Sequence, residues 1–154
     1  MDQKHLQLEA FLPYRLNRLA DAVSREFSAI YRKRYGLTRP EWRLLATLGQ
    51  YPTMTATEIG RHSAMHKTKV SRAVSALEKR RWLVRAADEA DRRVEHLRLS
   101  ETGLEAYRAL VPLAKQFERK LLAQIGDVER EAVSAALRLL EGLTLKEDPL
   151  RREA

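Results

Sequence analysis

The chain has 154 residues, with 29 Lys and Arg against 21 Asp and Glu, a formal net charge of +8, 44% apolar residues and no cysteine. This length suits one domain or a compact pair of small ones, and the apolar fraction excludes a wholly disordered chain. No apolar run approaches the ~20 residues of a membrane-spanning helix, and the N-terminus lacks the layout of a signal peptide. The absence of cysteine excludes disulfides, thiolate metal sites and thiol redox sensors. We therefore expect a soluble cytoplasmic protein with no membrane partner.

The first predicted element is a long helix. Apolar residues recur at gaps of three and four from Leu12 to Ile30 and form one stripe, as they do in an amphipathic helix. Pro13 suits the first turn of this helix. Gly36 follows the last periodic residues and is typical of a helix end.

Two capping boxes predict where the next helices begin. Residues 38–41 and 55–58 both place Glu three residues after Thr, which satisfies free N–H groups at a helix start. The second of these helices is about two turns long and reaches Ser63. A tight connection at residues 64–66 leads to a helix over residues 67–80, whose apolar residues at gaps of four and three face a core.

A β-hairpin is predicted next. Residues 82–85 and 94–99 flank a polar loop at residues 87–93, and the second run alternates apolar and polar side chains. This alternation is typical of a half-buried strand. Two short strands around a charged loop form a hairpin that projects from the body of the protein.

Two helices are predicted for the rest of the chain. Ser100 is placed to cap the first, whose apolar stripe runs from Leu104 to Ile125 with a kink expected at Pro112. The last helix carries apolar residues between Val128 and Leu143. The remaining residues, 146–154, are expected to form a frayed tail.

The surplus charge is concentrated in residues 61–85, which contain eight basic side chains and a single acidic one, Glu78. Helix, turn, basic helix and hairpin follow one another there, which is the order of a helix-turn-helix with a wing. Such a helix fits the major groove of duplex DNA, and Lys and Arg supply affinity by releasing counterions. An Arg at the hairpin turn suits a narrow minor groove, and Asp91 is placed to orient one guanidinium. The predicted DNA-contacting residues are Lys67, Thr68, Lys69, Ser71, Arg72, Ser75, Lys79, Arg80, Arg92 and Arg93.

Five segments carry a resemblance to a known family. They are Leu37–Leu45 (LTRPEWRLL), Thr57–Gly60 (TEIG), Lys69–Arg80 (KVSRAVSALEKR), Asp91–Arg93 (DRR) and Leu97–Gly103 (LRLSETG). In this order and at these spacings the sequence resembles the MarR family of bacterial transcription regulators.

The resemblance implies a mainly α fold with a small β-hairpin wing. It places a winged helix-turn-helix DNA-binding domain at residues 36–100, a dimerisation region at residues 1–35 and 101–145, and a flexible tail at residues 146–154. It also implies a homodimer formed by the N- and C-terminal helices, binding to pseudo-palindromic DNA operators, and release by a small ligand.

Two positions depart from the family pattern. The basic helix of the family usually ends in Gly, where this chain has Arg81. A left-handed cap conformation at Arg81 should cost up to ~1 kcal/mol or force a different cap. Ala90 stands where the family often has a further Arg in the wing.

The resemblance also implies an effector site between the first two helices and the dimer interface. Some relatives sense aromatic acids or aryl-CoA thioesters. Aromatic walls with a convergent Arg suit an aromatic carboxylate, and a basic cluster suits the phosphates of a CoA thioester. Core or dimer packing of the aromatics, and a solvated helix end for the basic residues, stay open as alternatives. The candidate effector-binding residues are Phe27, Tyr31, Arg32, Arg34, Tyr35 and Trp42.

These observations predict a ligand-responsive transcription regulator, a repressor released from its operator by a small aromatic acid or aryl-CoA thioester. The sequence offers no catalytic arrangement of nucleophile and base, so we expect no enzyme, no cofactor and no metal. His62 and His66 straddle a turn, which favours capping or phosphate contact over metal binding. A sequence-tolerant architectural DNA-binding protein and a metal-dependent sensor stay open as alternatives.

Overall fold

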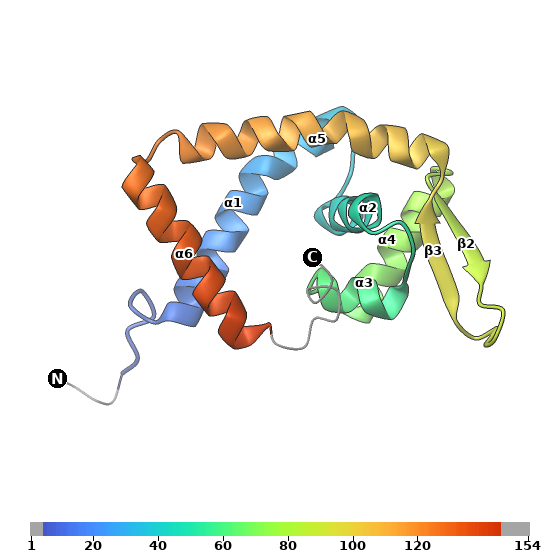
Figure 1. Ribbon diagram of the computed structural model, residues 1–154, viewed down its shortest axis with the longest axis horizontal. Helices are drawn as coiled ribbons and strands as arrows, with labels where there is room; N and C mark the ends of the chain where they lie inside the picture. The colour runs from blue at the N-terminus through green and yellow to red at the C-terminus, as the bar shows by residue number, and fades with distance from the viewer. Residues whose placement is uncertain (1–4, 146–154) are drawn as a thin grey trace. The chain divides into compact units, whose positions relative to one another are not determined.

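The computed structural model describes residues 5–145, so the predicted tail at residues 146–154 lies outside the described residues. The chain divides into two compact units, one ending at Arg39 and the other beginning at Pro40. Figure 1 labels the helices of both units and the two longer strands. Within the described part of the chain, every helix is too short or too polar to cross a membrane.

The first unit is built on one helix, α1 (Leu12–Tyr35), with proline in its first turn as predicted. Gly36 ends this helix in the left-handed conformation at φ 64°, which glycine adopts without strain. Asp21 forms ion pairs with Arg25 and, at 2.9 Å, with Arg39. Hydrogen bonds from the side chains of Arg39 and Arg25 lower the pKa of the Asp21 carboxyl.

Three helices form the core of the second unit, and all three were predicted. They are α2 (Arg39–Gln50), α3 (Ala56–His62) and α4 (Lys67–Lys79). Each buries one apolar face, because its apolar residues recur at helical spacing. The apolar core residues of these helices are at most 2% exposed; they are Leu44, Leu45, Leu48, Ile59, Val70, Ala73, Val74 and Leu77.

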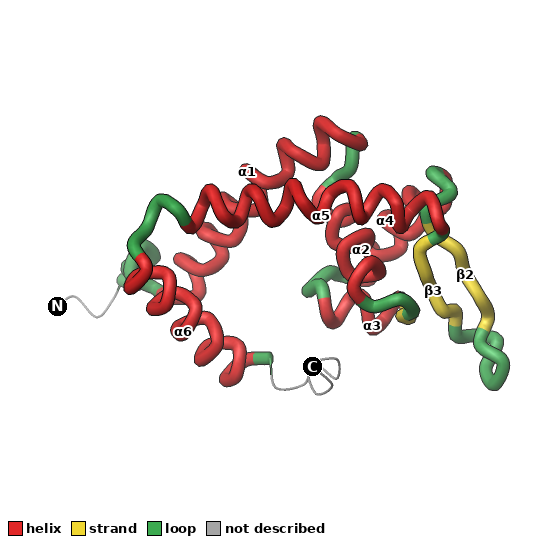
Figure 2. Tube along the Cα trace, turned by 45° about the horizontal axis from the view of Figure 1, so that its top comes forward, coloured by secondary structure: helices red, strands yellow, loops and turns green. Residues whose placement is uncertain are grey.

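A small antiparallel sheet accompanies these helices. The predicted hairpin is formed by β2 (Leu83–Ala87) and β3 (Glu95–Leu99), with Leu83 opposite Leu99. A third strand, β1 (Met54–Thr55), pairs with the other side of β3, so the strand order is β1-β3-β2. Figure 2 shows the two longer strands and their connecting loop extending beyond the helices of this unit. The sequence predicted the hairpin but not β1.

The helix α5 (Glu101–Leu122) begins at Ser100, whose hydroxyl accepts the N–H of Gly103 at 3.1 Å. A side chain at position 103 would overlap the carbonyl oxygen of Trp82, so this close approach requires glycine. The helix continues through Pro112, where the sequence predicted a kink, without ending there.

Large apolar side chains remain exposed on two helices. The last helix, α6 (Asp127–Thr144), buries none of its residues. On α6 the exposed residues include Val128 (80%), Leu139 (70%) and Leu143 (68%). On α1, Leu19 is 61% exposed, and Leu12 and Leu16 are also exposed. Both units therefore carry apolar surface that the single chain leaves in contact with water.

Candidate nucleic-acid interface

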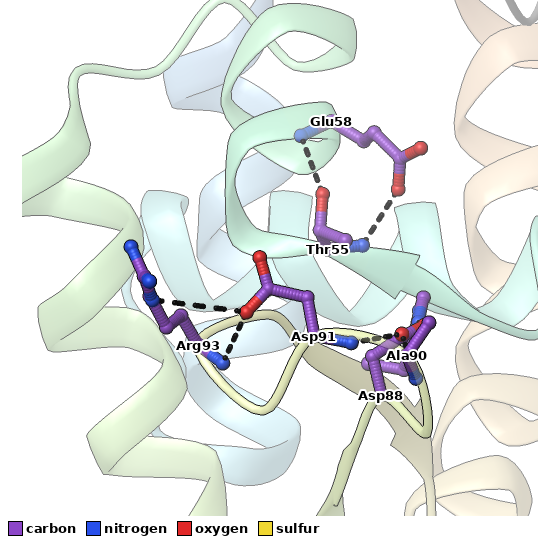
Figure 3. A network of polar contacts seen from close by, with 7 residues as sticks. Thr55, Glu58, Asp88, Ala90, Asp91 and Arg93 are labelled. Atoms are coloured by element: carbon purple, nitrogen blue, oxygen red, sulfur yellow. Dashed lines mark hydrogen bonds and ion pairs between the residues drawn. The ribbon is translucent and has the colours of Figure 1, made fainter.

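The helix α3 starts with the capping box that its sequence predicted. The Thr55 hydroxyl accepts the backbone N–H of Glu58 at 3.2 Å, and the Glu58 carboxylate accepts the backbone N–H of Thr55 at 2.7 Å (Figure 3). These reciprocal bonds satisfy two N–H groups that the first turn leaves without partners. They fix where the helix-turn-helix begins.

The turn between α3 and α4 is closed by main-chain hydrogen bonds. Ala64 adopts the left-handed conformation at φ 51°. The N–H of Met65 donates to the carbonyl of Gly60 at 3.0 Å, and that of Ala64 to the carbonyl of Arg61 at 3.5 Å. This pattern is a Schellman motif, which ends a helix sharply. It sets the direction in which α4 leaves the turn.

The helix α4 has one buried face and one exposed face. Its start is capped by His66, whose ring Nδ1 accepts the N–H of Thr68 at 3.4 Å, in agreement with the predicted capping role. The opposite face consists of short polar and basic side chains. Seven of the predicted DNA-contacting residues are exposed on α4; they are Lys67, Thr68, Lys69, Ser71, Arg72, Ser75 and Lys79.

Arg80 and Arg81 form the end of α4 and differ from its exposed face. The guanidinium of Arg80 lies over the ring of Trp82, 5.2 Å from its centroid, and the residue is half-buried. Arg81 has φ 60°. The N–H of Trp82 donates to the carbonyl of Leu77 at 2.9 Å, and that of Arg81 to the carbonyl of Glu78 at 2.8 Å. A second Schellman motif therefore closes α4 on a residue that is not glycine. Of the two outcomes expected at this position, the structure has the left-handed cap and not a different one.

The tip of the hairpin is organised by two aspartates (Figure 3). Asp88 accepts the backbone N–H groups of Ala90 at 2.8 Å and Asp91 at 2.9 Å. Its other carboxylate oxygen lies 2.7 Å from Nε2 of His96. The hydrogen bond with His96, followed by those from the two backbone N–H groups, lowers the pKa of Asp88 to about 2. This role of Asp88 was not predicted, although an Asp that precedes backbone N–H groups by two and three residues is the signature of an Asx turn.

Asp91 orients one of the two arginines at the tip. Its carboxylate accepts the backbone N–H of Arg93 at 3.0 Å and lies 3.9 Å from the Arg93 Nε. The Arg93 side chain is nevertheless 94% exposed, and Arg92 beside it is exposed as well. The loop therefore presents two guanidinium groups to solvent, and the Asp91 carboxylate lies beside that of Arg93.

The candidate effector residues are divided between the two units. Phe27 and Tyr31 meet edge to face on α1, with ring centroids 5.3 Å apart, and Tyr31 is 1% exposed. The Arg34 guanidinium lies 5.8 Å from the centroid of the Tyr35 ring, and Arg32 is exposed. Trp42 belongs to the second unit and is half-buried. Their shared role in binding an effector stays a prediction.

The two central histidines serve separate local contacts. His62 packs its ring against Tyr51 in an edge-to-face contact, with centroids 4.9 Å apart, while His66 caps α4. In residues 5–145, no three His, Cys, Asp or Glu side chains are grouped so as to hold a metal ion.

A basic helix presented by a helix-turn-helix, with an arginine-tipped hairpin beside it, defines the winged-helix class of DNA-binding proteins. Comparison with known proteins finds similarity to one family within that class. Residues 35–94 match the family model described as MarR family. Over its helix-turn-helix and wing, the chain is therefore similar to the MarR family of winged helix-turn-helix transcription regulators.

Individual relatives agree with this assignment. The chain is 29% identical over 105 residues to YwoH of Bacillus subtilis, an HTH-type transcriptional regulator, and the match covers 68% of this chain and 76% of that protein. A MarR family regulator from Silicibacter pomeroyi has the same fold, with a TM-score of 0.78, 29% identity, and coverage of 90% of this chain and 98% of that one. BpsR of Bordetella bronchiseptica, whose DNA binding is regulated by 6-hydroxynicotinic acid, is 20% identical, with a TM-score of 0.76 and coverage of 89% and 97%.

Proposed function

We propose that this protein is a homodimeric repressor that binds a pseudo-palindromic operator and is released by a small aromatic acid or its CoA thioester. The observation that carries the proposal is the polar and basic face of α4, whose side chains are exposed while the opposite face is buried. Lys and Arg on such a face neutralise phosphates, and short polar side chains leave room for an approach to base edges.

Different parts of this face have different roles in the proposal. Thr68, Lys69 and Arg72 lie in the first half of α4, the part that usually enters the major groove. Lys79 lies at the far end, where it contacts phosphate. Arg80 has its guanidinium over Trp82, so Lys79 is the stronger candidate for the phosphate contact. Arg93 enters the adjacent minor groove in an orientation set by Asp91.

The exposed apolar surface supports the homodimer. The apolar residues of α6 cover more than one face, since Val128 and Leu139 lie on one side and Val133 and Leu137 on another. The apolar face is therefore wider than the stripe that packs against a single neighbouring helix, while charged residues such as Arg130, Glu131 and Arg138 occupy the remaining side. In the proposal, α1 and α6 cover their apolar faces in the dimer, and residues 36–100 form the DNA-binding domain.

The ring pair on α1 supports an aromatic effector. Phe27 provides apolar ring surface and packs edge to face against the buried Tyr31, and Arg32 and Arg34 follow within a turn of Tyr31. Rings with a nearby guanidinium suit an aromatic carboxylate. BpsR shares the fold, and 6-hydroxynicotinic acid, which regulates its DNA binding, belongs to this chemical class.

The proposal is tested by selecting duplexes from a random pool with the purified protein at physiological salt. A repressor of this kind enriches a motif with two inverted half-sites about one helical turn apart, and light scattering gives twice the mass of the chain. Thermal-shift screening of aromatic acids and their CoA thioesters then identifies effectors by a raised Tm. Failure to enrich any motif, with equal retention of random duplexes, would establish an architectural protein instead.

A further inference from the structure

Arg85 connects three elements of the winged helix. Its Nε and Nη2 donate to the two carboxylate oxygens of Glu78 at 2.6 and 2.8 Å, and its Nη1 donates to Glu95 at 2.7 Å. Glu78 lies in the last turns of α4, Arg85 on β2 and Glu95 on β3. One guanidinium therefore joins the basic helix to both strands of the wing.

The geometry of this contact is well suited to fixing an angle. Two parallel bonds between one guanidinium and one carboxylate hold both groups in a plane, which a single bond to an ammonium would not do. In the sheet, Arg85 is paired with buried Leu97 and lies on the face that packs against α3 and α4. Arg98, one position further along β3, lies on the opposite face.

The charge of Arg85 is already balanced inside the protein. Hydrogen bonds with Glu78 and Glu95 raise the pKa of its guanidinium above the usual value, and the bond from Arg85 lowers the pKa of Glu78. All three guanidinium nitrogens, Nε, Nη1 and Nη2, donate to these carboxylates. An arginine engaged in this way is poorly available to a DNA phosphate, although it lies within the basic segment that the sequence marked as DNA-binding.

We propose that Arg85 is a positioning residue, which sets the orientation of the wing relative to α4 and thereby places Arg93 at the DNA while contacting no phosphate itself. This inference rests on the proposed DNA binding of the helix and wing. Loss of the Arg85 contacts frees the hairpin to turn about its base at α4, so the tip no longer reaches the minor groove in register with the helix.

A double-mutant cycle on the selected duplex tests this role. Arg85→Met is expected to weaken binding about five- to fiftyfold in the wild-type background and less than about twofold when Arg93 is already alanine, because the two residues act through one contact. An arginine that binds phosphate itself would cost affinity in both backgrounds and flatten the dependence on log salt by about 1 in both. Additive losses of that kind overturn the inference.

Glu78→Gln tests the same role, because loss of this negative charge and loss of the Arg85 contact change DNA affinity in opposite directions. Removing a negative charge near DNA strengthens binding through the general field, whereas loosening the Arg85 contact weakens it. The matched control is Glu89→Gln in the exposed hairpin loop, which removes the same charge without touching Arg85. We expect weaker binding for Glu78→Gln, and unchanged or tighter binding for Glu89→Gln.

The outcomes separate the two proposals. If the wild-type protein binds no duplex, the proposed function fails and this inference fails with it. If the wild-type protein binds but Glu78→Gln binds at least as tightly as Glu89→Gln, only the positioning role is refuted. Because Glu78→Gln retains the arginine at position 85, this comparison tests the positioning role even where Arg85→Met does not fold.

Discussion

Replacing Arg81 with glycine should stabilise the protein, although most glycine substitutions near a helix destabilise one. Arg81 has φ 60°, a conformation that costs a residue with a Cβ about 1–2 kcal/mol, at or above the upper limit expected from the sequence. Glycine relieves this strain but adds about 0.4–1 kcal/mol of conformational entropy to the unfolded chain. The hydrogen bonds of the motif involve only main-chain groups of this residue, so glycine preserves them. The expected net gain is about 0.5–1 kcal/mol.

The assay is thermal and urea unfolding at fixed protein concentration. For a chain of this size the gain corresponds to a rise in Tm of about 1–4 °C. Arg81→Ala removes the charge and keeps the strain, so its Tm should stay near that of the wild type. Ser75→Gly, at an exposed position inside α4, should lose about 0.5 kcal/mol. If Arg81→Gly is no more stable than Arg81→Ala, the strain assigned to this position is absent.

Three further predictions follow from the described contacts. Arg72→Ala should relax specificity at one base position, whereas Lys79→Ala should weaken all duplexes alike and flatten the salt dependence; equal losses on specific and random duplexes for Arg72→Ala refute base reading. The pKa of Asp88 is lowered to about 2, so the stability it confers is complete above the unfolded value near 3.8 and is lost as the pH falls towards 2. Asp88→Asn should therefore flatten this part of the stability profile measured by urea unfolding, and an unchanged slope contradicts the assignment. Gly103→Ala should destabilise by more than ~1 kcal/mol, because the new Cβ meets the main chain at Trp82. Gly142→Ala, where a Cβ meets nothing within 4 Å, should stabilise α6 by up to ~1 kcal/mol; similar effects of the two substitutions in thermal unfolding contradict this.

Local signals predicted most of the fold because they depend on neighbours in the sequence. Thr55 and Glu58 are three residues apart, and their capping box forms as predicted. The same holds for Ser100 and for the buried stripe of α4. By contrast, β1 has two residues, too few for any alternation to show, and it exists because β3 offers it a partner more than forty positions later.

The candidate site was predictable in its charge but not in its internal partners. The sequence places Arg80 and Arg85 in one basic segment and treats all its positive charges alike. The structure separates them, since Arg80 lies over Trp82 and Arg85 is held by Glu78 and Glu95. These contacts join residues from different elements, so they follow from the packing of the strands against α4 and from no spacing along the chain.

The main-chain motifs on either side of α4 have a consequence for how such proteins diverge. The same main-chain motif stands before and after the helix, at Ala64 and Arg81, and neither motif uses a side chain from the exposed face. The end of α3 and the end of α4 are therefore independent of the side chains on the exposed face of α4, and the start of α4 depends on the cap at His66. Mutations there can give descendants a preference for other promoters while the frame that carries them stays the same.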